Sequence, residues 1–254
     1  MTPIPLIIVG ALGRMGQTLI KKFSNDARFE IIGAVISSRP EQNAPNEWEF
    51  PVVSELDQLV PHLRPKTLIV DFSHFSKLES LVTFASRHKC SLLVGTTGHP
   101  SAHMTLLSRA AEYIGVLFAP NTSIMANLMI EFSHLAAATL PHSAVLINDI
   151  HHRHKKDAPS GTALAIKKAI EGAEAELDQD IEINCARIAE VMGEHSVRFF
   201  KKNECLEISH KVFDRAIFAE GALFAALFLS QQGPGLYDMA DVLNLNMTIE
   251  NRPN

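Results

Sequence analysis

The chain has few of the residues that hold small secreted proteins together. It contains three cysteines, Cys90, Cys185 and Cys205, among 254 residues, and no two of them form a C-x-x-C pair. Neither a disulfide framework nor a zinc ribbon is therefore expected. Because free thiols are typical of reducing compartments, we predict a cytoplasmic location.

Long apolar runs are also missing. The longest run late in the chain, 222–229, is far shorter than the roughly 20 residues that a membrane-spanning helix needs. The apolar run 4–9 has the length of one strand, and no basic segment precedes it, so no signal peptide is expected. We predict no association with a membrane.

Positive charge is scarce over most of the chain. Lysine and arginine number 23 and aspartate and glutamate 28, so the formal net charge is −5. Sequence-independent binding of nucleic acid needs a basic face, and we therefore exclude nucleic acid as a partner. The basic segment 151–156 is a local exception, which favours a focused pocket for a small anion.

Strand-like and helix-like segments alternate over the first 120 residues. Short apolar runs and stretches of helical periodicity follow one another at 6–9, 14–23, 29–36, 68–72, 76–87, 92–94, 101–113 and 116–118. This alternation predicts an α/β fold with a Rossmann-type, doubly wound parallel sheet. Segment 38–66 contains five prolines and is expected to be irregular.

The pattern changes from Ser123 onward. One long helix is expected at 124–140 and a strand at 144–150. The segments 181–188, 196–201 and 204–212 read as strands without helices between them, and 216–229 is again helical. Clustered strands of this kind predict an α+β domain with an open mixed sheet.

A glycine-rich loop joins the first strand to the first helix. Residues 10–16 follow the spacing G-x-x-G-x-x-G, in which glycines let the backbone approach a pyrophosphate at a helix N-terminus. A tight turn with no ligand is the alternative, because such patterns also occur by chance. The residues expected to bind a dinucleotide here are Gly10, Ala11, Leu12, Gly13, Arg14 and Met15.

The residues after the second strand bear on the choice of nucleotide. An NAD site usually has an acidic residue about 20 residues past the glycine loop, to bind the ribose hydroxyls. Here Ser37, Ser38 and Arg39 stand at that position, and with Arg14 they could donate to a 2′-phosphate. We predict that NADPH is preferred over NADH; a simple polar turn before Pro40 is the competing interpretation.

The segment 151–163 reads His-His-Arg-His-Lys-Lys-Asp-Ala-Pro-Ser-Gly-Thr-Ala. So many charges cannot be buried without partners, which predicts a loop ending at a helix start. Such a helix start binds anions, and histidine and lysine can move protons. The segment therefore predicts a site for a small acid on which a proton is moved, with His154 and Lys156 also interpretable as a solvated loop.

A metal site is the other interpretation of this segment, since neutral imidazoles bind zinc. Adjacent histidines on a strand, such as His151 and His152, point to opposite faces, and the neighbouring Lys and Arg charges oppose a dication. We expect no metal.

The segment resembles the substrate-site motif of the dihydrodipicolinate reductase family over thirteen positions. Segments 71–73, 95–98 and 119–123 resemble further family motifs, each at a strand end. The resemblance implies a homotetrameric enzyme that uses NADPH or NADH to reduce 4-hydroxy-tetrahydrodipicolinate, a small dicarboxylate, with loss of water, in diaminopimelate and lysine biosynthesis. It implies a dinucleotide-binding domain at 1–122 and 215–254 and a substrate-binding and oligomerisation domain at 123–214.

The resemblance also assigns roles to residues. His151 is the implied proton donor, and Lys155 the second acid and carboxylate partner. Substrate contacts are implied for His152, Ser160, Gly161 and Thr162. Further contacts with the cofactor are implied for Gly95, Thr96, Thr97, Ala119, Pro120, Asn121 and Thr122.

Two features depart from the family pattern. Asp149 stands where the family usually has Glu, and the short acidic segment 171–176 replaces a longer glycine-rich loop that helps subunits assemble. Two alternatives to the family function are a related dehydrogenase acting on another small acid and a nucleotide-binding sensor without catalysis. The complete His/Lys and Ser-Gly-Thr segment argues against both.

Overall fold

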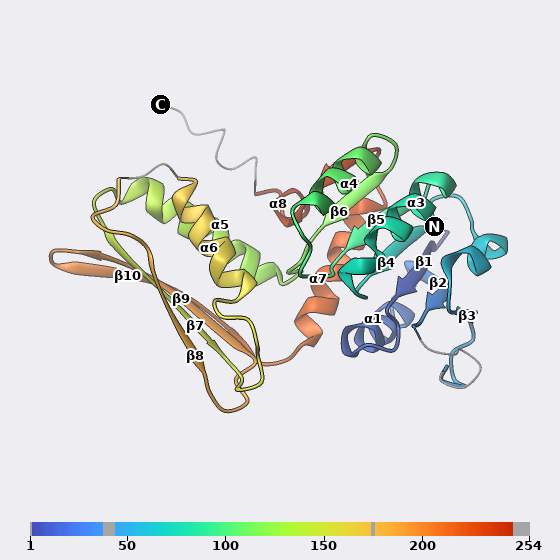
Figure 1. Ribbon diagram of the computed structural model, residues 1–254, viewed down its shortest axis with the longest axis horizontal. Coiled ribbons are helices and arrows are strands. Elements are labelled where there is room, and N and C mark those ends of the chain that lie inside the picture. Colours follow the sequence, from blue (N-terminus) through green and yellow to red (C-terminus); the bar gives the residue numbers. More distant parts are fainter. Residues whose placement is uncertain (1, 38–43, 174–175, 246–254) are drawn as a thin grey trace. The chain divides into compact units, whose positions relative to one another are not determined.

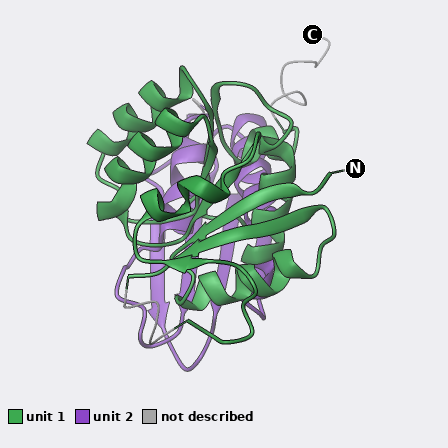
Figure 2. Ribbon diagram, turned by 90° about the vertical axis from the view of Figure 1, so that its right-hand side faces the viewer, with its two compact units in different colours: residues 1–122, 218–254 green, residues 123–217 purple. Residues whose placement is uncertain are grey.

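The computed structural model describes residues 2–37, 44–173 and 176–245. The chain divides into two compact units, residues 1–122 with 218–254 and residues 123–217 (Figures 1 and 2). Within the described residues, no helix combines the length and the apolar character that crossing a bilayer requires.

The first unit is built on a parallel sheet. Among the described residues it has seven strands in the order β11-β6-β5-β4-β1-β2-β3, and every neighbouring pair is parallel (Figure 1). The strands are β1 (Ile4–Val9), β2 (Phe29–Val35), β3 (Val52–Val53), β4 (Leu68–Asp71), β5 (Ser91–Val94), β6 (Gly115–Phe118) and β11 (Gly235–Tyr237). This topology confirms the predicted Rossmann-type sheet.

Helices cover both faces of this sheet. They are α1 (Arg14–Ser24), α3 (Leu78–His88), α4 (Ala102–Ala111), α7 (Ala216–Leu229) and α8 (Met239–Val242), with the 3-10 helices η1 (Leu56–His62) and η2 (Phe75–Lys77). Alternate residues of β1 enter two separate cores. Leu6 and Ile8 pack with α1 and α7, whereas Ile7 and Val9 pack with α3 and α4. A parallel sheet buried on both faces explains why its strands are continuous apolar runs.

Several short elements lie where the sequence pattern predicted none. Within 38–66, β3 and η1 form in the described part, although that segment was expected to be irregular. Strand β3 exists because Val52 and Val53 pair with Ala34 and Val35 of β2, a tertiary contact that no local periodicity reports. The same holds for β11, which is three residues long and pairs with β6.

The second unit is a mixed sheet with helices on one face (Figure 1). Its strands, in the order β10-β9-β7-β8, are β7 (Ala144–His151), β8 (Glu182–Arg187), β9 (Gly193–Lys201) and β10 (Glu204–Val212). Strand β9 is antiparallel to β7 and β10, and β8 is parallel to β7. Helices α5 (Ile124–Thr139) and α6 (Gly161–Glu171) pack on one face around Val145 and Ile147. The predicted α+β unit with an open mixed sheet is confirmed.

Candidate active site

The basic segment connects the end of a strand to the start of a helix, as its composition predicts. Strand β7 ends at His151, and α6 begins at Gly161. Ser160 caps this helix, because its hydroxyl oxygen accepts a hydrogen bond from the Ala163 N–H at 3.2 Å. The helix has no acidic residue in its first turn.

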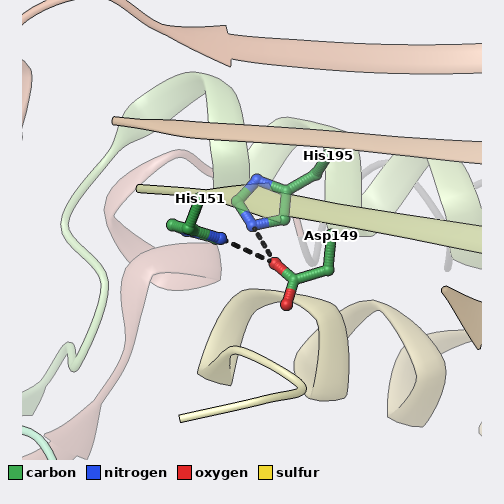
Figure 3. Close-up of side chains that lie close together, drawn as sticks. All are labelled: Asp149, His151 and His195. Atoms are coloured by element: carbon green, nitrogen blue, oxygen red, sulfur yellow. Dashed lines mark ion pairs between the residues drawn. The ribbon is translucent and has the colours of Figure 1, made fainter. Parts of the chain in front are cut away.

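A buried carboxylate lies between two histidines at the end of β7 (Figure 3). Oδ1 of Asp149 is 2.9 Å from Nδ1 of His151 and 3.3 Å from Nε2 of His195. Asp149 and His151 share a face of β7 because they are two residues apart, and β9 places His195 opposite Asp149. The two contacts have the length of hydrogen bonds, but their angles are not ideal. Catalytic hydrogen bonds are often poorly aligned before substrate binds.

The second oxygen of this carboxylate is held from two other directions. The Ser160 backbone N–H donates to Oδ2 at 2.8 Å, and Nη2 of Arg187 donates to it at 3.0 Å. Arg187 also donates to the carbonyl oxygens of Asp149 and Asp157. It reaches them from β8, whose parallel register pairs Arg187 with His151. Arg187 therefore links β8, β7 and the loop after β7 through hydrogen bonds.

These partners set the charge of Asp149. Its side chain is fully buried, and burial alone would raise its pKa. The close contacts with His151 and His195 and the hydrogen bond from Ser160 outweigh that effect and hold the pKa of Asp149 well below its usual range. The carboxylate is therefore ionised and can only accept hydrogen bonds.

The other residues of the loop have partners of their own. Nζ of Lys155 lies 2.8 Å from the carboxylate of Asp157. Burial would raise the pKa of Asp157, but the Lys155 hydrogen bond and nearby positive charges lower it. Partial desolvation, followed by the charges of Arg215, His151 and His154, lowers the pKa of His152.

The helix start beside this loop is open. A Cβ atom built at Gly161 would meet no atom within 4 Å, so space remains above the first turn of α6. Thr162 follows it, half-buried. Small residues at a helix start with open space suit a carboxylate bound by backbone N–H groups.

The glycine loop in the first unit has the backbone that its sequence predicts. Gly10 has φ +83°, and a Cβ there would lie 2.6 Å from the carbonyl oxygen of Phe72. A Cβ at Gly16 would collide with the backbone of Gly10 and Ala11. Within the described structure no side chain caps α1 at Gly13, and its first turn has no acidic residue. These features leave a helix N-terminus suited to a phosphate.

The ends of β4 and β5 carry a linked pair of polar residues. The hydroxyl of Thr96 donates to Oδ2 of the buried Asp71 at 2.7 Å, and Ser73 donates to Oδ1. Burial raises the pKa of Asp71 despite these bonds. Gly95 must lack a side chain, because a Cβ there would overlap the ring of Phe72. Thr97, the residue after Thr96, is exposed.

A side-chain hydrogen bond anchors the segment after β6 to α7. The hydroxyl of the buried Thr122 donates to the carbonyl oxygen of Phe218 on α7 at 2.7 Å. Ala119 is buried and Pro120 exposed, with a half-buried Asn121 between them and Thr122. Ser37 is exposed after β2, whereas Ser38 and Arg39 lie outside the described residues.

Part of the site was not predicted from the sequence. No role was predicted for His195 or Arg187, and Asp149 was considered only as a departure from the family pattern. The spacing between Asp149 and His151 could have shown that they share a strand face. The contributions of His195 and Arg187 depend on the pairing of β9 and β8 with β7, for which the sequence has no local signal.

The buried cluster also contains groups that metals bind. Asp149, His151 and His195 offer ligand atoms within 4.8 Å of one another, a different set from the one considered on sequence. Arg187 already occupies Oδ2 of Asp149, and its positive charge opposes a dication beside it. The prediction that no metal binds here rests on this charge.

Comparisons with known proteins agree with the motifs. Residues 4–122 match the N-terminal part and residues 125–243 the C-terminal part of dihydrodipicolinate reductase. A 4-hydroxy-tetrahydrodipicolinate reductase of Burkholderia orbicola (strain MC0-3) is 34% identical, and the match covers 94% of this chain and 99% of that protein. One of Hahella chejuensis (strain KCTC 2396) is 33% identical, covering 94% and 98%.

Solved structures show the same fold. The dipicolinate-bound dihydrodipicolinate reductase from Paenisporosarcina sp. TG-14 has a TM-score of 0.80 and 24% identity, covering 93% of this chain and 97% of that one. A C. glutamicum DAP dehydrogenase in complex with DAP has a TM-score of 0.61 and 16% identity, with both chains fully covered. The chain therefore belongs to the dihydrodipicolinate reductase family, a family of oxidoreductases.

Proposed function

We propose that this reductase converts 4-hydroxy-tetrahydrodipicolinate to tetrahydrodipicolinate in diaminopimelate and lysine biosynthesis. The 4-hydroxyl leaves as water to give a conjugated cyclic imine. Reduction of this imine requires hydride at ring carbon 4, which a bound nicotinamide would supply, and a proton for the resulting enamine. The observation that carries the proposal is the mostly buried His151 beside the ionised Asp149, because histidine is the side chain best suited to give a proton near neutral pH.

The substrate has two carboxylates, and the loop and helix start suit them. In this proposal Lys155 acts as the second acid and carboxylate partner, and a substrate carboxylate competes with Asp157 for its ammonium group. His152, Ser160, Gly161 and Thr162 bind substrate. The support is the capped, open start of α6, where hydroxyl and backbone N–H groups gather.

The cofactor is NADPH in preference to NADH. The pyrophosphate would bind to residues 10–15 at the uncapped start of α1. Segments 95–97 and 119–122 would lie along the nicotinamide. The preference rests on Ser37, Ser38, Arg39 and Arg14, since the four residues directly after β2, 36–39, include no acid that would repel a 2′-phosphate.

Assembly and location complete the proposal. We assign cofactor binding to 1–122 and 215–254 and substrate binding to 123–214, in a homotetramer. Helices α5 and α6 cover only one face of the mixed sheet, which leaves the other face for contacts between subunits. A cytoplasmic location is supported by the three cysteines, all of which are free thiols.

The direct test is one assay. Purified protein is mixed with freshly generated 4-hydroxy-tetrahydrodipicolinate, and the loss of NADPH and of NADH absorbance is followed in parallel. Rapid oxidation that depends on substrate, and is faster with NADPH, is expected. Binding of nucleotide without oxidation would instead point to a sensor, and oxidation with a different small acid to a related dehydrogenase.

A further inference from the structure

We infer that Asp149 and Gly193 are positioning residues for the proton donor. Asp149 holds Nδ1 of His151, and Gly193 keeps Nε2 uncovered, so that Nε2 is the atom that gives the proton. This inference rests on the proposed role of His151.

The position of Asp149 is determined from several sides. Its Oδ2 accepts from the Ser160 N–H at 2.8 Å and from Nη2 of Arg187 at 3.0 Å. Both donors are tied elsewhere, Ser160 at the start of α6 and Arg187 on β8. With Oδ2 held in this way, Oδ1 can face only the two imidazoles of His151 and His195. The carboxylate is therefore a rigid support for His151.

The charge of this support decides which nitrogen of His151 faces it. An ionised carboxylate only accepts, so the nitrogen 2.9 Å away, Nδ1, must carry a hydrogen. In the imidazolium the second hydrogen is then on Nε2. When the Nε2–H bond breaks and a C–H bond forms on the enamine carbon, the neutral ring keeps Nδ1–H toward Asp149. The ring regains its Nε2 proton from water for the next turnover.

Gly193 makes room at the reactive atom. It begins β9, and a Cβ built there would lie 3.1 Å from Nε2 and 3.4 Å from Cδ2 of His151. Any side chain at position 193 would therefore crowd the nitrogen that has to reach substrate. A methyl group at position 193 would fit only if the ring of His151 moved by a few tenths of an ångström.

His195 completes the arrangement from the other side. Its Nε2 lies 3.3 Å from Oδ1 of Asp149 and 3.3 Å from the hydroxyl oxygen of Ser160. Its ring stacks on that of His210, with centroids 6.2 Å apart and planes 10° apart. Asp149, His151 and His195 are all buried, so water does not compete for Oδ1 of Asp149.

The test compares six proteins with saturating NADPH: wild type, Asp149→Asn, Asp149→Glu, Gly193→Ala, His151→Ala and the control Glu194→Gln. We expect Asp149→Asn and Gly193→Ala to lower kcat about 100-fold or more, the range of a lost general acid, with the KM for NADPH unchanged. Asp149→Glu, which restores the carboxylate and the residue usual in the family, should recover most of kcat. Glu194→Gln makes the same carboxylate-to-amide change on the opposite face of β9 and should have no effect.

Isotope effects separate positioning from a structural role. If proton delivery becomes the slow step, the solvent deuterium isotope effect on kcat rises in Asp149→Asn and Gly193→Ala. The kinetic isotope effect on kcat that is measured with deuterated NADPH falls in the same variants. A merely destabilised enzyme would lose activity without a change in either isotope effect. That result would overturn the inference. If Asp149→Asn does not fold, Gly193→Ala decides the question alone.

The remaining outcomes distinguish this inference from the function on which it depends. Normal kcat in both Asp149→Asn and Gly193→Ala, with His151→Ala inactive, overturns the positioning roles and leaves the proposed donor intact. Normal turnover in His151→Ala overturns the donor and the inference together. A wild-type protein that does not oxidise NADPH with this substrate overturns the proposed function itself.

Discussion

Nε2 of His195 and Nδ1 of His151 share a single oxygen atom, Oδ1 of Asp149, at 3.3 and 2.9 Å. A shared acceptor links the two histidines, since neither ring can turn without changing the surroundings of the other. The unit 123–217 therefore holds His151 in a fixed position at the end of β7, and the open start of α6 lies at the other end of the same loop. Preorganisation of this kind lowers the cost of aligning groups during the reaction.

The charge of Asp149 should make the stability of the fold depend on pH. Its pKa is depressed in the folded chain, so its contribution is present above the unfolded value of about 3.9 and is lost as pH falls below that. Thermal unfolding of wild type and Asp149→Asn between pH 7 and pH 3 measures this contribution. We expect the wild type to be more stable at pH 7 and the difference in Tm between the two proteins to shrink below about pH 4. A gap that does not vary with pH would mean that Asp149 is not ionised.

The open space at Gly161 predicts a variant that separates folding from binding. Gly161→Ala adds a methyl group that meets no neighbour within 4 Å, so the Tm should not change. The methyl would stand where a substrate carboxylate approaches the helix start, and loss of one charged hydrogen bond costs about 1.5–3 kcal/mol. We expect the KM for substrate to rise about tenfold or more. Gly233→Ala, also without neighbours, is the matched control; equal KM values in both would remove Gly161 from the substrate site.

The residue after β2 should control the choice of nucleotide. Ser37→Asp places a carboxylate where a 2′-phosphate is proposed to bind, and like charges repel. The ratio of kcat/KM for NADPH to that for NADH should fall about tenfold, or about 1.4 kcal/mol. Ser80→Asp, at an exposed position of α3, tests the effect of an added charge elsewhere. An unchanged ratio in Ser37→Asp would place the 2′-phosphate away from this strand end.

Close packing of α7 on the segment after β6 predicts a stability defect. A Cβ at Gly221 would overlap the carbonyl oxygen of Thr122, which is a backbone atom and cannot move aside freely. We expect Gly221→Ala to destabilise the fold by about 1–3 kcal/mol. The Tm should drop by about 2–4 °C per kcal/mol. A Tm equal to that of wild type would show that α7 can shift, and Thr122→Val then tests the hydroxyl bond to Phe218 separately.

Metal removal should leave the reaction unaffected. Arg187 on Oδ2 of Asp149 opposes a dication at the buried cluster, so dialysis against a strong chelator should leave kcat unchanged. Elemental analysis of the purified protein should find no stoichiometric transition metal. Activity that is lost on chelation and restored by zinc would reverse this conclusion and make Asp149, His151 and His195 its ligands.

Local pattern in the chain was sufficient for the main elements and for the loops at 10–13 and 152–160. The alternating apolar runs predicted the parallel sheet because strands buried on both faces must be continuously apolar. The spacing of residues 10–16 predicted the glycine loop, and the density of charge at 151–156 predicted a loop that ends at a helix start. Each of these signals lies within a few neighbouring residues, where steric and solvation effects act directly.

Strand pairing decided the rest. β3 and β11 are too short to have a period of their own and form only because β2 and β6 offer partners. His195 and Arg187 join Asp149 because β9 and β8 align with β7 in one particular register. That register depends on burying one face of the mixed sheet under α5 and α6, a property of the whole unit that no single segment of the chain encodes.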